Sequence, residues 1–510
     1  MVCAAAVTLM ACGVGDLSPS DAGLRPDLGP IGQQFDGGVA PDAQAQSDAG
    51  TDFLGRRIAE VPVDLLFVSP DERELLFTDG RGRLTTIHPD GKDREVIADD
   101  ATKIFAPRPV VWMFTGASDD GQSATVKAYQ PGARSLATVS SSAAHGLLWS
   151  DDDGARAIIT DRFTIAEVGI TSTRTADIVL ADSEGLGQTT ILSGVNVGLW
   201  DPAQARFEGA CAPYAAFTST RTVMVAACSP GTRQRRLHVH DIDRGHTATV
   251  APSVLNIIVP SEDRTWVLWV DDQINVFGST PDGSHVVALA ETATITDLEF
   301  LDDTRFAYTT SQGELKIAEW PFMQPSTLRM SGVQKIRSVS PFGRRLLFSQ
   351  GTQTISDLFM IDTSTDSSQG PVILSDQPTA LPGDSAWTPD GTHVIWYATL
   401  DDDDFGVVKS RRADGSGGEV LVGSKVFQVR PLPGPGHRLL IMMNARLAAM
   451  GRSTVPFADL SVRDLDTVSG VDTLVRGAHA ADLVVFPRSS RVVFQVPLGP
   501  NAGVWVRDID

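Results

Sequence analysis

The sequence has little of several features that would each indicate a class of protein. Only four of its 510 residues are cysteine, and Lys and Arg number 42 against 63 Asp and Glu. The net charge of -21 repels phosphate backbones, so nucleic acid is excluded as an expected partner. Long amphipathic helical stretches are nearly absent, while 42% of the residues are hydrophobic, enough for a core.

Common catalytic motifs are missing as well. The sequence has no Gly-x-Ser-x-Gly nucleophile elbow with suitably placed Asp and His. It has no Gly-rich dinucleotide motif and no phosphate loop ending in Gly-Lys-Ser/Thr. A non-enzymatic protein is therefore expected. An enzyme whose catalytic groups come from distant parts of the chain is the alternative.

The N-terminus reads as an export signal. Residues 2–11 form an apolar run that is too short to cross a bilayer as a helix but has the length of a signal-peptide core. The run ends in Leu9-Met10-Ala11-Cys12, which resembles the lipobox of bacterial lipoproteins. The resemblance implies a signal peptide over 1–11 and lipidation of Cys12. No Lys or Arg precedes the run, which departs from that pattern.

Residues 12–52 are rich in Asp, Gly, Pro, Ala, Gln and Ser and lack a periodic apolar pattern. Such a segment cannot bury enough surface to offset its conformational entropy, so we expect a disordered tether with a reach of about 35 Å. Gly13 follows Cys12, and the absence of Asp there favours the outer membrane. The expected location is the cell envelope, facing the periplasm or the exterior.

From residue 53 onwards, a turn followed by a very apolar strand recurs every 40 to 50 residues. Pro presets φ for the turn, Asp accepts nearby backbone N–H groups and Gly tolerates positive φ. The clearest copies of the pattern are Val68-Ser-Pro-Asp-Glu-Arg-Glu-Leu-Leu-Phe-Thr78, Val339-Ser-Pro-Phe-Gly-Arg-Arg-Leu-Leu-Phe-Ser349 and Trp387-Thr-Pro-Asp-Gly-Thr-His-Val-Ile-Trp-Tyr397. Four short strands per unit at this period predict an all-β fold, a β-propeller over 53–510.

These units resemble the TolB-type propeller repeat, whose core is Ser-Pro-Asp-Gly followed by an apolar strand. About ten candidate units can be marked, some of which could be halves of one irregular blade. Seven or eight blades are therefore the first choice, with up to ten as the upper bound, in one propeller or two. The last unit, Leu483–Ile509, shows three strands, and a strand over Arg56–Val61 is expected to complete it.

Cys211 and Cys228 are the only cysteines of the body. In an exported protein such a pair is expected to form a disulfide, and two buried free thiols are the alternative. An oxidising compartment would favour the disulfide over two free thiols.

Two motifs carry weak metal signals. Asp401, Asp402, Asp403 and Asp404 could offer oxygen ligands to Ca²⁺, the one cofactor considered, but a solvated acidic turn is the simpler interpretation. His238 and His240 share one face of an expected strand and could form a metal pair, but an ordinary half-exposed strand is the simpler interpretation. Recurrent tryptophans on strands are assigned to the core.

Together these features predict a lipid-anchored envelope propeller that binds or scaffolds an envelope protein or a small ligand. The alternative is a propeller hydrolase or lyase acting on sugars or lactones, with carboxylates or a metal in an axial site. The resemblance to TolB implies an envelope protein as partner.

Overall fold

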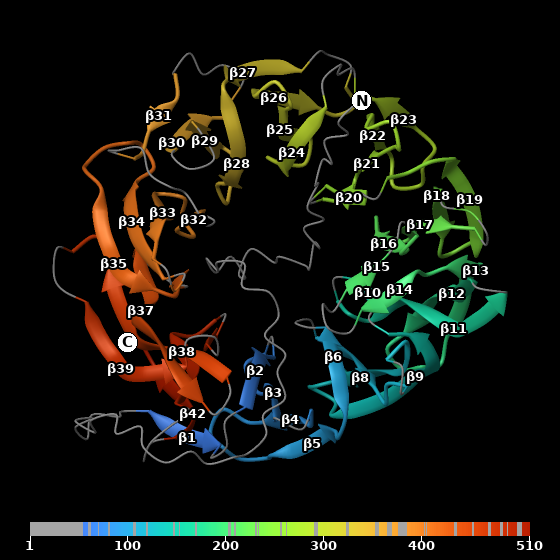
Figure 1. Ribbon diagram of the computed structural model, residues 1–510, viewed down its shortest axis with the longest axis horizontal. Helices are drawn as coiled ribbons and strands as arrows, with labels where there is room; N and C mark the ends of the chain where they lie inside the picture. Colours follow the sequence, from blue (N-terminus) through green and yellow to red (C-terminus); the bar gives the residue numbers. More distant parts are fainter. Residues whose placement is uncertain are drawn as a thin grey trace. The chain divides into compact units, whose positions relative to one another are not determined.

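The computed structural model describes residues 55–509, apart from short internal stretches of which 376–384 is the longest. The expected signal peptide, Cys12 and the tether lie outside the described residues. The described residues form β-strands joined by turns (Figure 1). Among them, no helix has the length and apolar character needed to cross a membrane.

Most of the strands follow one another in groups of four along the chain. Their bounds are β1 Arg56–Ala59, β2 Val63–Val68, β3 Leu75–Asp79, β4 Leu84–Ile87, β5 Glu95–Ala98, β6 Ala101–Phe105, β7 Val111–Thr115, β8 Ser123–Gln130, β9 Ser135–Ala144, β10 Leu148–Ser150, β11 Arg156–Val168, β12 Thr171–Asp182, β13 Gln188–Asn196, β14 Leu199–Asp201, β15 Arg206–Glu208, β16 Tyr214–Phe217, β17 Thr222–Cys228, β18 Arg235–Asp241, β19 His246–Ala251, β20 Ile258–Pro260, β21 Val267–Val270, β22 Val276–Ser279 and β23 Val286–Ala288. They continue with β24 Ile295–Phe300, β25 Arg305–Thr310, β26 Glu314–Glu319, β27 Thr327–Ser331, β28 Val333–Val339, β29 Arg345–Gly351, β30 Ser356–Asp362, β31 Val372–Ile373, β32 Ser385–Trp387, β33 His393–Leu400, β34 Gly406–Arg412, β35 Val420–Val426, β36 Gln428–Pro431, β37 Arg438–Met450, β38 Ser453–Asp464, β39 Asp472–His479, β40 Leu483–Val485, β41 Arg491–Val496 and β42 Gly503–Asp508.

Sheet pairing within the described residues gives ten four-stranded antiparallel blades. Eight are separate sheets, and two more, β10–β13 and β16–β19, are joined into one sheet by the single pair Asn196 and Cys228. The all-β propeller prediction is confirmed, with more blades than the seven or eight that the sequence favours. Ten is the upper bound of the predicted range, because each candidate unit forms a complete blade rather than half of one.

The last blade is completed from the other end of the chain, as expected. β40, β41 and β42 form three strands, and β1 pairs antiparallel with β42 through Arg56 and Val506 and through Arg57 and Trp505. Ile58 and Ala59 of β1 are buried against Phe77 of β3 and Val504 of β42. β1 therefore contributes both a backbone ladder and apolar side chains to this blade.

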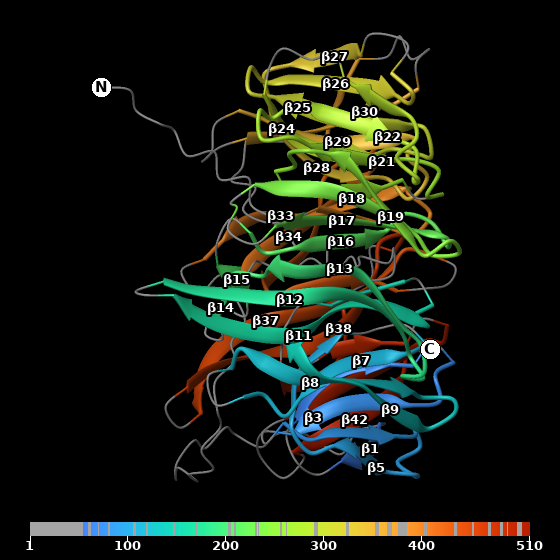
Figure 2. The same cartoon turned by 90° about the vertical axis from the view of Figure 1, so that its right-hand side faces the viewer.

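Two compact units divide the chain. Within the described residues, one contains Glu291–Ala445 and Leu460–Leu474, and the other contains 55–290, Arg446–Asp459 and 475–509. In the second unit, apolar clusters join successive blades. For example, Trp112 and Phe114 of β7 pack with Ile159 of β11. Figure 2 shows β11 and β12 as a long hairpin that extends past neighbouring strands.

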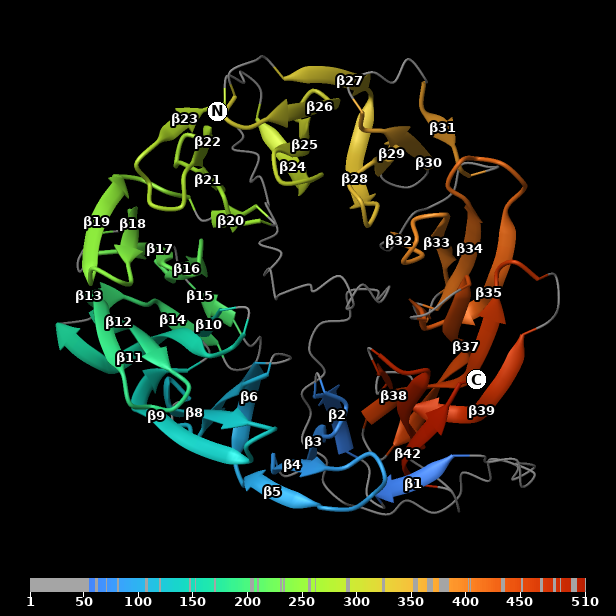
Figure 3. The same ribbon diagram turned by 180° about the vertical axis from the view of Figure 1, so that it is seen from behind.

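The first unit is built in the same way. Leu346 and Phe348 of β29 pack with Ala307 of β25. Leu347, from the other face of β29, packs with Trp396 of β33, so each blade buries both of its faces. Figure 3 shows the blades β28–β31 and β32–β35 from behind. A single four-stranded sheet would leave one apolar face in water, and stacking of blades removes that exposure.

The recurrent turn motif has a common hydrogen-bond pattern. A Ser or Thr hydroxyl donates to the Asp two residues later and accepts a backbone N–H from five residues later, at Ser69, Ser261 and Thr388. The Asp also accepts a hydrogen bond from the backbone N–H of the residue two positions after it. Because these bonds satisfy polar groups that are buried at the start of the second strand, the motif fixes where the first hairpin of a blade turns.

The other strand assignments also hold. Residues 438–450, whose pattern could be read as helical, form strand β37. Among the recurrent tryptophans, Trp266 and Trp396 are fully buried, whereas Trp149 and Trp505 are half-buried. Trp269 and Trp387 are buried too, which fits their assignment to the core.

A buried histidine predicts how stability depends on pH. His145 is 7% exposed, and its Nε2 lies 2.8 Å from the Thr102 hydroxyl. Burial, with a smaller effect of the Lys103 charge, lowers the pKa of His145 to about 4. As the pH falls, His145 of the unfolded chain is protonated near pH 6.5, whereas His145 of the folded chain is protonated only near pH 4. The free energy of unfolding should therefore fall by up to about 3 kcal/mol over this window.

Urea unfolding at several pH values checks the predicted fall in the free energy of unfolding. His145→Gln should flatten the slope between pH 6.5 and 4 relative to the unaltered chain, and the same substitution at the exposed His246 should not. Equal slopes for the two variants would contradict the assignment.

Candidate functional site

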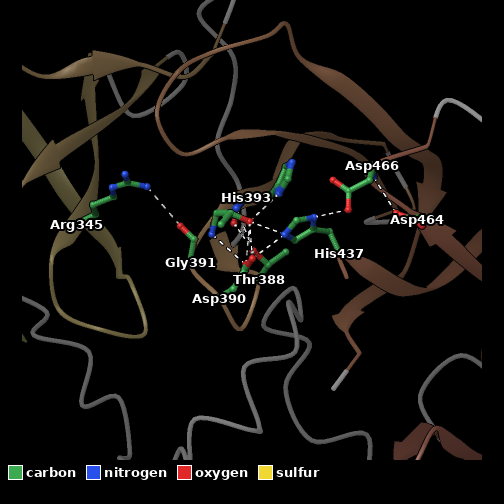
Figure 4. A network of polar contacts seen from close by, with 9 residues as sticks. Arg345, Thr388, Asp390, Gly391, His393, His437, Asp464 and Asp466 are labelled. Atoms are coloured by element: carbon green, nitrogen blue, oxygen red, sulfur yellow. Dashed lines mark hydrogen bonds and ion pairs between the residues drawn. The ribbon is translucent and has the colours of Figure 1, made fainter. Parts of the chain in front are cut away.

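The strongest cluster of chemistry-bearing side chains lies in the first unit, at one end of the blades β32–β35 and β36–β39 (Figure 4). Asp390 lies in the turn between β32 and β33, and His393 begins β33. His437 directly precedes β37, and Asp466 follows β38. Asp390, His437 and Asp466 lie in turns, where side chains can vary without disturbing the ladders. His393 pairs with Arg412 in the ladder of β33 and β34.

His437 is held between two carboxylates. Its Nδ1 lies 2.6 Å from Asp466 Oδ2, and its Nε2 lies 2.7 Å from Asp390 Oδ2. The hydroxyl of Thr392 is also 2.7 Å from Nε2. The turn that carries Asp466 is held by a hydrogen bond in which the Asp466 backbone N–H donates to Asp464 Oδ1. The imidazole is therefore fixed from both sides.

Asp390 is the carboxylate of the turn motif. It accepts hydrogen bonds from the hydroxyls of Thr388 and Thr392 and from the backbone N–H of Thr392. Burial raises its pKa, but the hydrogen bonds from Thr388 and His437 outweigh burial and hold the pKa well below the ordinary value. Asp390 is thus ionised at neutral pH and rigidly placed.

The two histidines are electrostatically different. Burial lowers the pKa of His437, but the bonds to Asp390 and Asp466 overcome it and raise the pKa above the ordinary value. His393 is 6% exposed, and burial together with the His437 charge lowers its pKa. Their ring centres lie 4.4 Å apart. The pair therefore has one imidazole that favours a proton and one that favours the neutral form, a good ligand.

A cavity of about 200 Å³ opens beside the cluster. Its lining residues are Arg345, Thr392, His393, Arg412, Asp414 and His437. The Arg412 side chain is exposed and forms no ion pair with the residues that the structure describes. The lining carries two guanidinium groups against one carboxylate, although the chain as a whole has a net charge of -21.

A larger cavity, about 520 Å³, lies in the second unit and differs in character. Its charged lining groups are paired with one another: Arg491 Nε lies 2.6 Å from Asp508 Oδ1, and His88 Nδ1 lies 2.7 Å from Asp90 Oδ1. Glu72 accepts the backbone N–H of Arg488. These groups are used by the blade β1–β42–β41–β40 and its neighbour, so the smaller cavity is the better candidate site.

A hydroxyl, an imidazole and a carboxylate are aligned in the cluster. Thr392 Oγ1, His437 and Asp466 follow one another at 2.7 and 2.6 Å. In a catalytic triad the imidazole must accept the hydroxyl proton. Here the Thr392 hydroxyl lies 2.8 Å from Asp390 Oδ2, to which it donates, and both ring nitrogens of His437 already contact carboxylates. The arrangement is a hydrogen-bonded ion cluster rather than an activated nucleophile.

The acidic run lies elsewhere. Asp401 Oδ1 accepts the backbone N–H of Asp403 at 3.1 Å and of Phe405 at 2.9 Å, in the turn before β34. Asp402 and Asp404 lie outside the described residues. These bonds fit the alternative of an acidic turn, and the calcium prediction stays a prediction.

His238 and His240 both lie on β18, as expected. Each imidazole bonds to a threonine of β19: His240 Nδ1 to Thr247 at 2.9 Å and His238 Nδ1 to Thr249 at 3.2 Å. Among the described residues, the group of metal-binding side chains that comes together is His393, His437 and Asp466 instead. The strand pair therefore has no third ligand in the part of the chain that the structure describes.

Cys211 and Cys228 are joined by a disulfide, with their Cα atoms 5.5 Å apart. Cys228 ends β17, and both residues are buried. The bond ties the segment before β16 to a central strand of the blade β16–β19.

Sequence reasoning found the turn around Asp390 but missed the cluster. His393 and His437 are 44 residues apart, close to one repeat, so each precedes or begins the second strand of successive blades. Aligning the repeats by their turns would have placed the two histidines at neighbouring blade ends. No spacing in the sequence brings Asp466 to them.

Comparisons with known proteins give a fold-level picture. No protein-family model matches the chain, and no curated protein matches it. Solved structures similar to it include a eukaryotic initiation factor, 11% identical with a TM-score of 0.47, covering 71% of this chain and 87% of that one. TolB from Acinetobacter baumannii is 14% identical with a TM-score of 0.26, covering 60% and 78%.

An oligogalacturonate lyase in complex with manganese is 10% identical with a TM-score of 0.33, covering 60% of this chain and 91% of that one. These scores transfer no function. The class of protein, a β-propeller of four-stranded antiparallel blades, is defined by the strand pairing itself.

Proposed function

We propose that this protein is an exported, lipid-anchored propeller of the TolB-type repeat class that binds a small anionic ligand without transforming it. The observation that carries the binding role is the cavity beside His393. Two guanidinium groups, Arg345 and Arg412, line it in a strongly acidic protein. Guanidinium groups recognise carboxylate and phosphate through charge-assisted hydrogen bonds.

The size of the cavity limits the ligand. At about 200 Å³ it is smaller than the roughly 300–1,000 Å³ of sites that enclose drug-sized molecules. A small carboxylate or phosphate, or the anionic end of a longer molecule, is the expected occupant. Thr392 and His437 add polar side chains to the lining of the same cavity.

The anchor and the location rest on other features. Leu9-Met10-Ala11-Cys12 supplies the lipidation pattern, and 12–52 has the composition of a tether. The Cys211–Cys228 disulfide supports an oxidising compartment. In this proposal Cys12 holds the propeller at the cell envelope, with the outer membrane as the favoured membrane.

Lipidation is tested by expressing the full chain and Cys12→Ala in a bacterium fed a radiolabelled fatty acid. The full chain should carry label and sediment with membranes, and Cys12→Ala should lose the label and become soluble. Cys3→Ala is the matched control and should behave as the unaltered chain. Label that persists in Cys12→Ala would contradict the anchor.

Anion binding is tested by calorimetric titration with succinate, glutarate and inorganic phosphate. At least one should bind, and Arg412→Ser should weaken that binding about tenfold or more, because a charge-assisted hydrogen bond contributes about 1.5–3 kcal/mol. Arg236→Ser, at an exposed position of β18, is the control and should leave binding unchanged. Failure of all three anions to bind, or equal binding by Arg412→Ser, would refute the role of the cavity.

The alternative, a hydrolase, is favoured by one observation, the alignment of Thr392, His437 and Asp466. It is the weaker proposal because both ring nitrogens of His437 contact carboxylates and the Thr392 hydroxyl donates to Asp390. Ester or lactone hydrolysis that Thr392→Val abolishes would reinstate it.

A further inference from the structure

We propose that His393, His437 and Asp466 bind one divalent transition-metal ion of the zinc type. This site goes beyond the proposed anion-binding role and does not depend on it. The three residues each offer one ligand atom, and these atoms all lie within 4.8 Å of one another. They come from the starts of β33 and β37 and from the turn after β38.

The spacing is close to what a metal requires. Nitrogen and oxygen ligands lie about 2.0–2.2 Å from zinc, so tetrahedral ligands stand about 3.4 Å apart. Asp466 Oδ2 and His437 Nδ1 are already 2.6 Å apart, and the ring centres of His393 and His437 are 4.4 Å apart. Rotation of the His393 and His437 side chains can bring the third ligand into the same shell, without any change in the strand ladders.

The surroundings of His437 are those of a metal ligand. Asp466 contacts Nδ1, so an ion shared with Asp466 binds that nitrogen and leaves the Nε2–H to donate to Asp390 at 2.7 Å. A ligating histidine commonly donates its second N–H to a carboxylate, which fixes the tautomer and the ring orientation. Asp390 is in turn held by Thr388 and Thr392.

The donor set selects the class of ion. Two imidazoles and one carboxylate suit Zn²⁺ and related transition metals, whereas Ca²⁺ prefers six to eight oxygen ligands. His393 and His437 also line the 200 Å³ cavity. The coordination positions that the protein does not fill therefore face the cavity, where water or an anion can occupy them.

Charged side chains from three different blades surround the proposed ion. Asp466 and Asp390 are the carboxylates at His437, and Asp414 lines the cavity. Arg345 and Arg412 are the cations of the lining. A divalent ion at His437 adds positive charge where the two carboxylates converge, which favours binding.

The test is calorimetric titration of the full chain with Zn²⁺, after its free thiols have been alkylated and it has been treated with a chelator. One zinc ion should bind per chain, and Ca²⁺ should not compete. His437→Gln and His393→Gln should each weaken binding at least a hundredfold, and Asp390→Asn about tenfold. His238→Gln, a strand histidine bonded to a threonine, is the matched control and should bind as the unaltered chain does.

Asp466→Asn keeps the test decisive if a histidine variant does not fold, since the Asp466 side chain is 40% exposed. It should retain the melting temperature and lose at least tenfold in zinc affinity. Cobalt bound in place of zinc should show the intense visible absorption of a four- or five-coordinate ion. Absence of bound zinc, or zinc bound equally by His437→Gln and Asp466→Asn, would overturn the proposal.

Discussion

Deletion of residues 53–62 should lower the free energy of unfolding by about 4 kcal/mol or more. This segment contains β1, the strand that completes the blade β1–β42–β41–β40. Its loss removes the ladder between Arg56 and Val506 and exposes Phe77 and Val504, against which Ile58 is packed. Removing one large buried aliphatic side chain costs about 2–5 kcal/mol, and the unpaired edge of β42 adds to that.

The matched control is deletion of 13–52, which should change the urea midpoint little. Ile58→Ala separates the apolar part of the effect from the ladder and should cost about 2–4 kcal/mol alone. Urea unfolding followed by circular dichroism measures all three variants. Equal and negligible shifts for the deletions of 53–62 and 13–52 would contradict the pairing of β1 with β42.

Replacement of Cys211 and Cys228 by alanine together should lower the free energy of unfolding by about 3 kcal/mol. The disulfide closes a loop with a sequence separation of 17, and the chain-entropy model gives about this value for a loop of that length. The effect arises mainly in the unfolded chain, which gains freedom when the link is removed. The folded blade keeps its ladders on either side of Cys228.

The unaltered chain in excess reductant should show the same loss as the double alanine variant, and the variant should not respond to reductant. Mass spectrometry without reduction should find the two thiols bonded in the exported protein. Two free thiols there would contradict the disulfide, and a reductant effect of equal size on the variant would assign the loss to another cause.

Local chemistry explains why much of the fold could be predicted. The turn at Ser69 and the turn at Thr388 use the same hydroxyl and Asp pattern, so similar letters make similar hydrogen bonds. The pattern is not required, however. β16 and β17 are joined by a turn in which Thr218 and Thr222 bond to each other, with no Pro or Asp. A unit without the pattern can be read as half of an irregular blade, which explains why the sequence favours seven or eight blades over ten.

The candidate site could not be predicted because its parts meet only after the blades have packed. The turn at Asp390 is visible in the sequence, whereas its contact with His437 joins residues 47 positions apart in successive blades. The conspicuous His238 and His240 lie together on one strand, but each hydroxyl partner comes from the neighbouring strand β19. Proximity in sequence therefore indicated the weaker cluster.

Hydrogen–deuterium exchange of the β1 amides tests the central claim most directly, namely that the first strand and the last three form one blade. The amides of residues 56–59 should exchange slowly, at rates like those of their partners in residues 503–508. Exchange at the rate of an unstructured peptide, with the amides of β41 still protected, would contradict it.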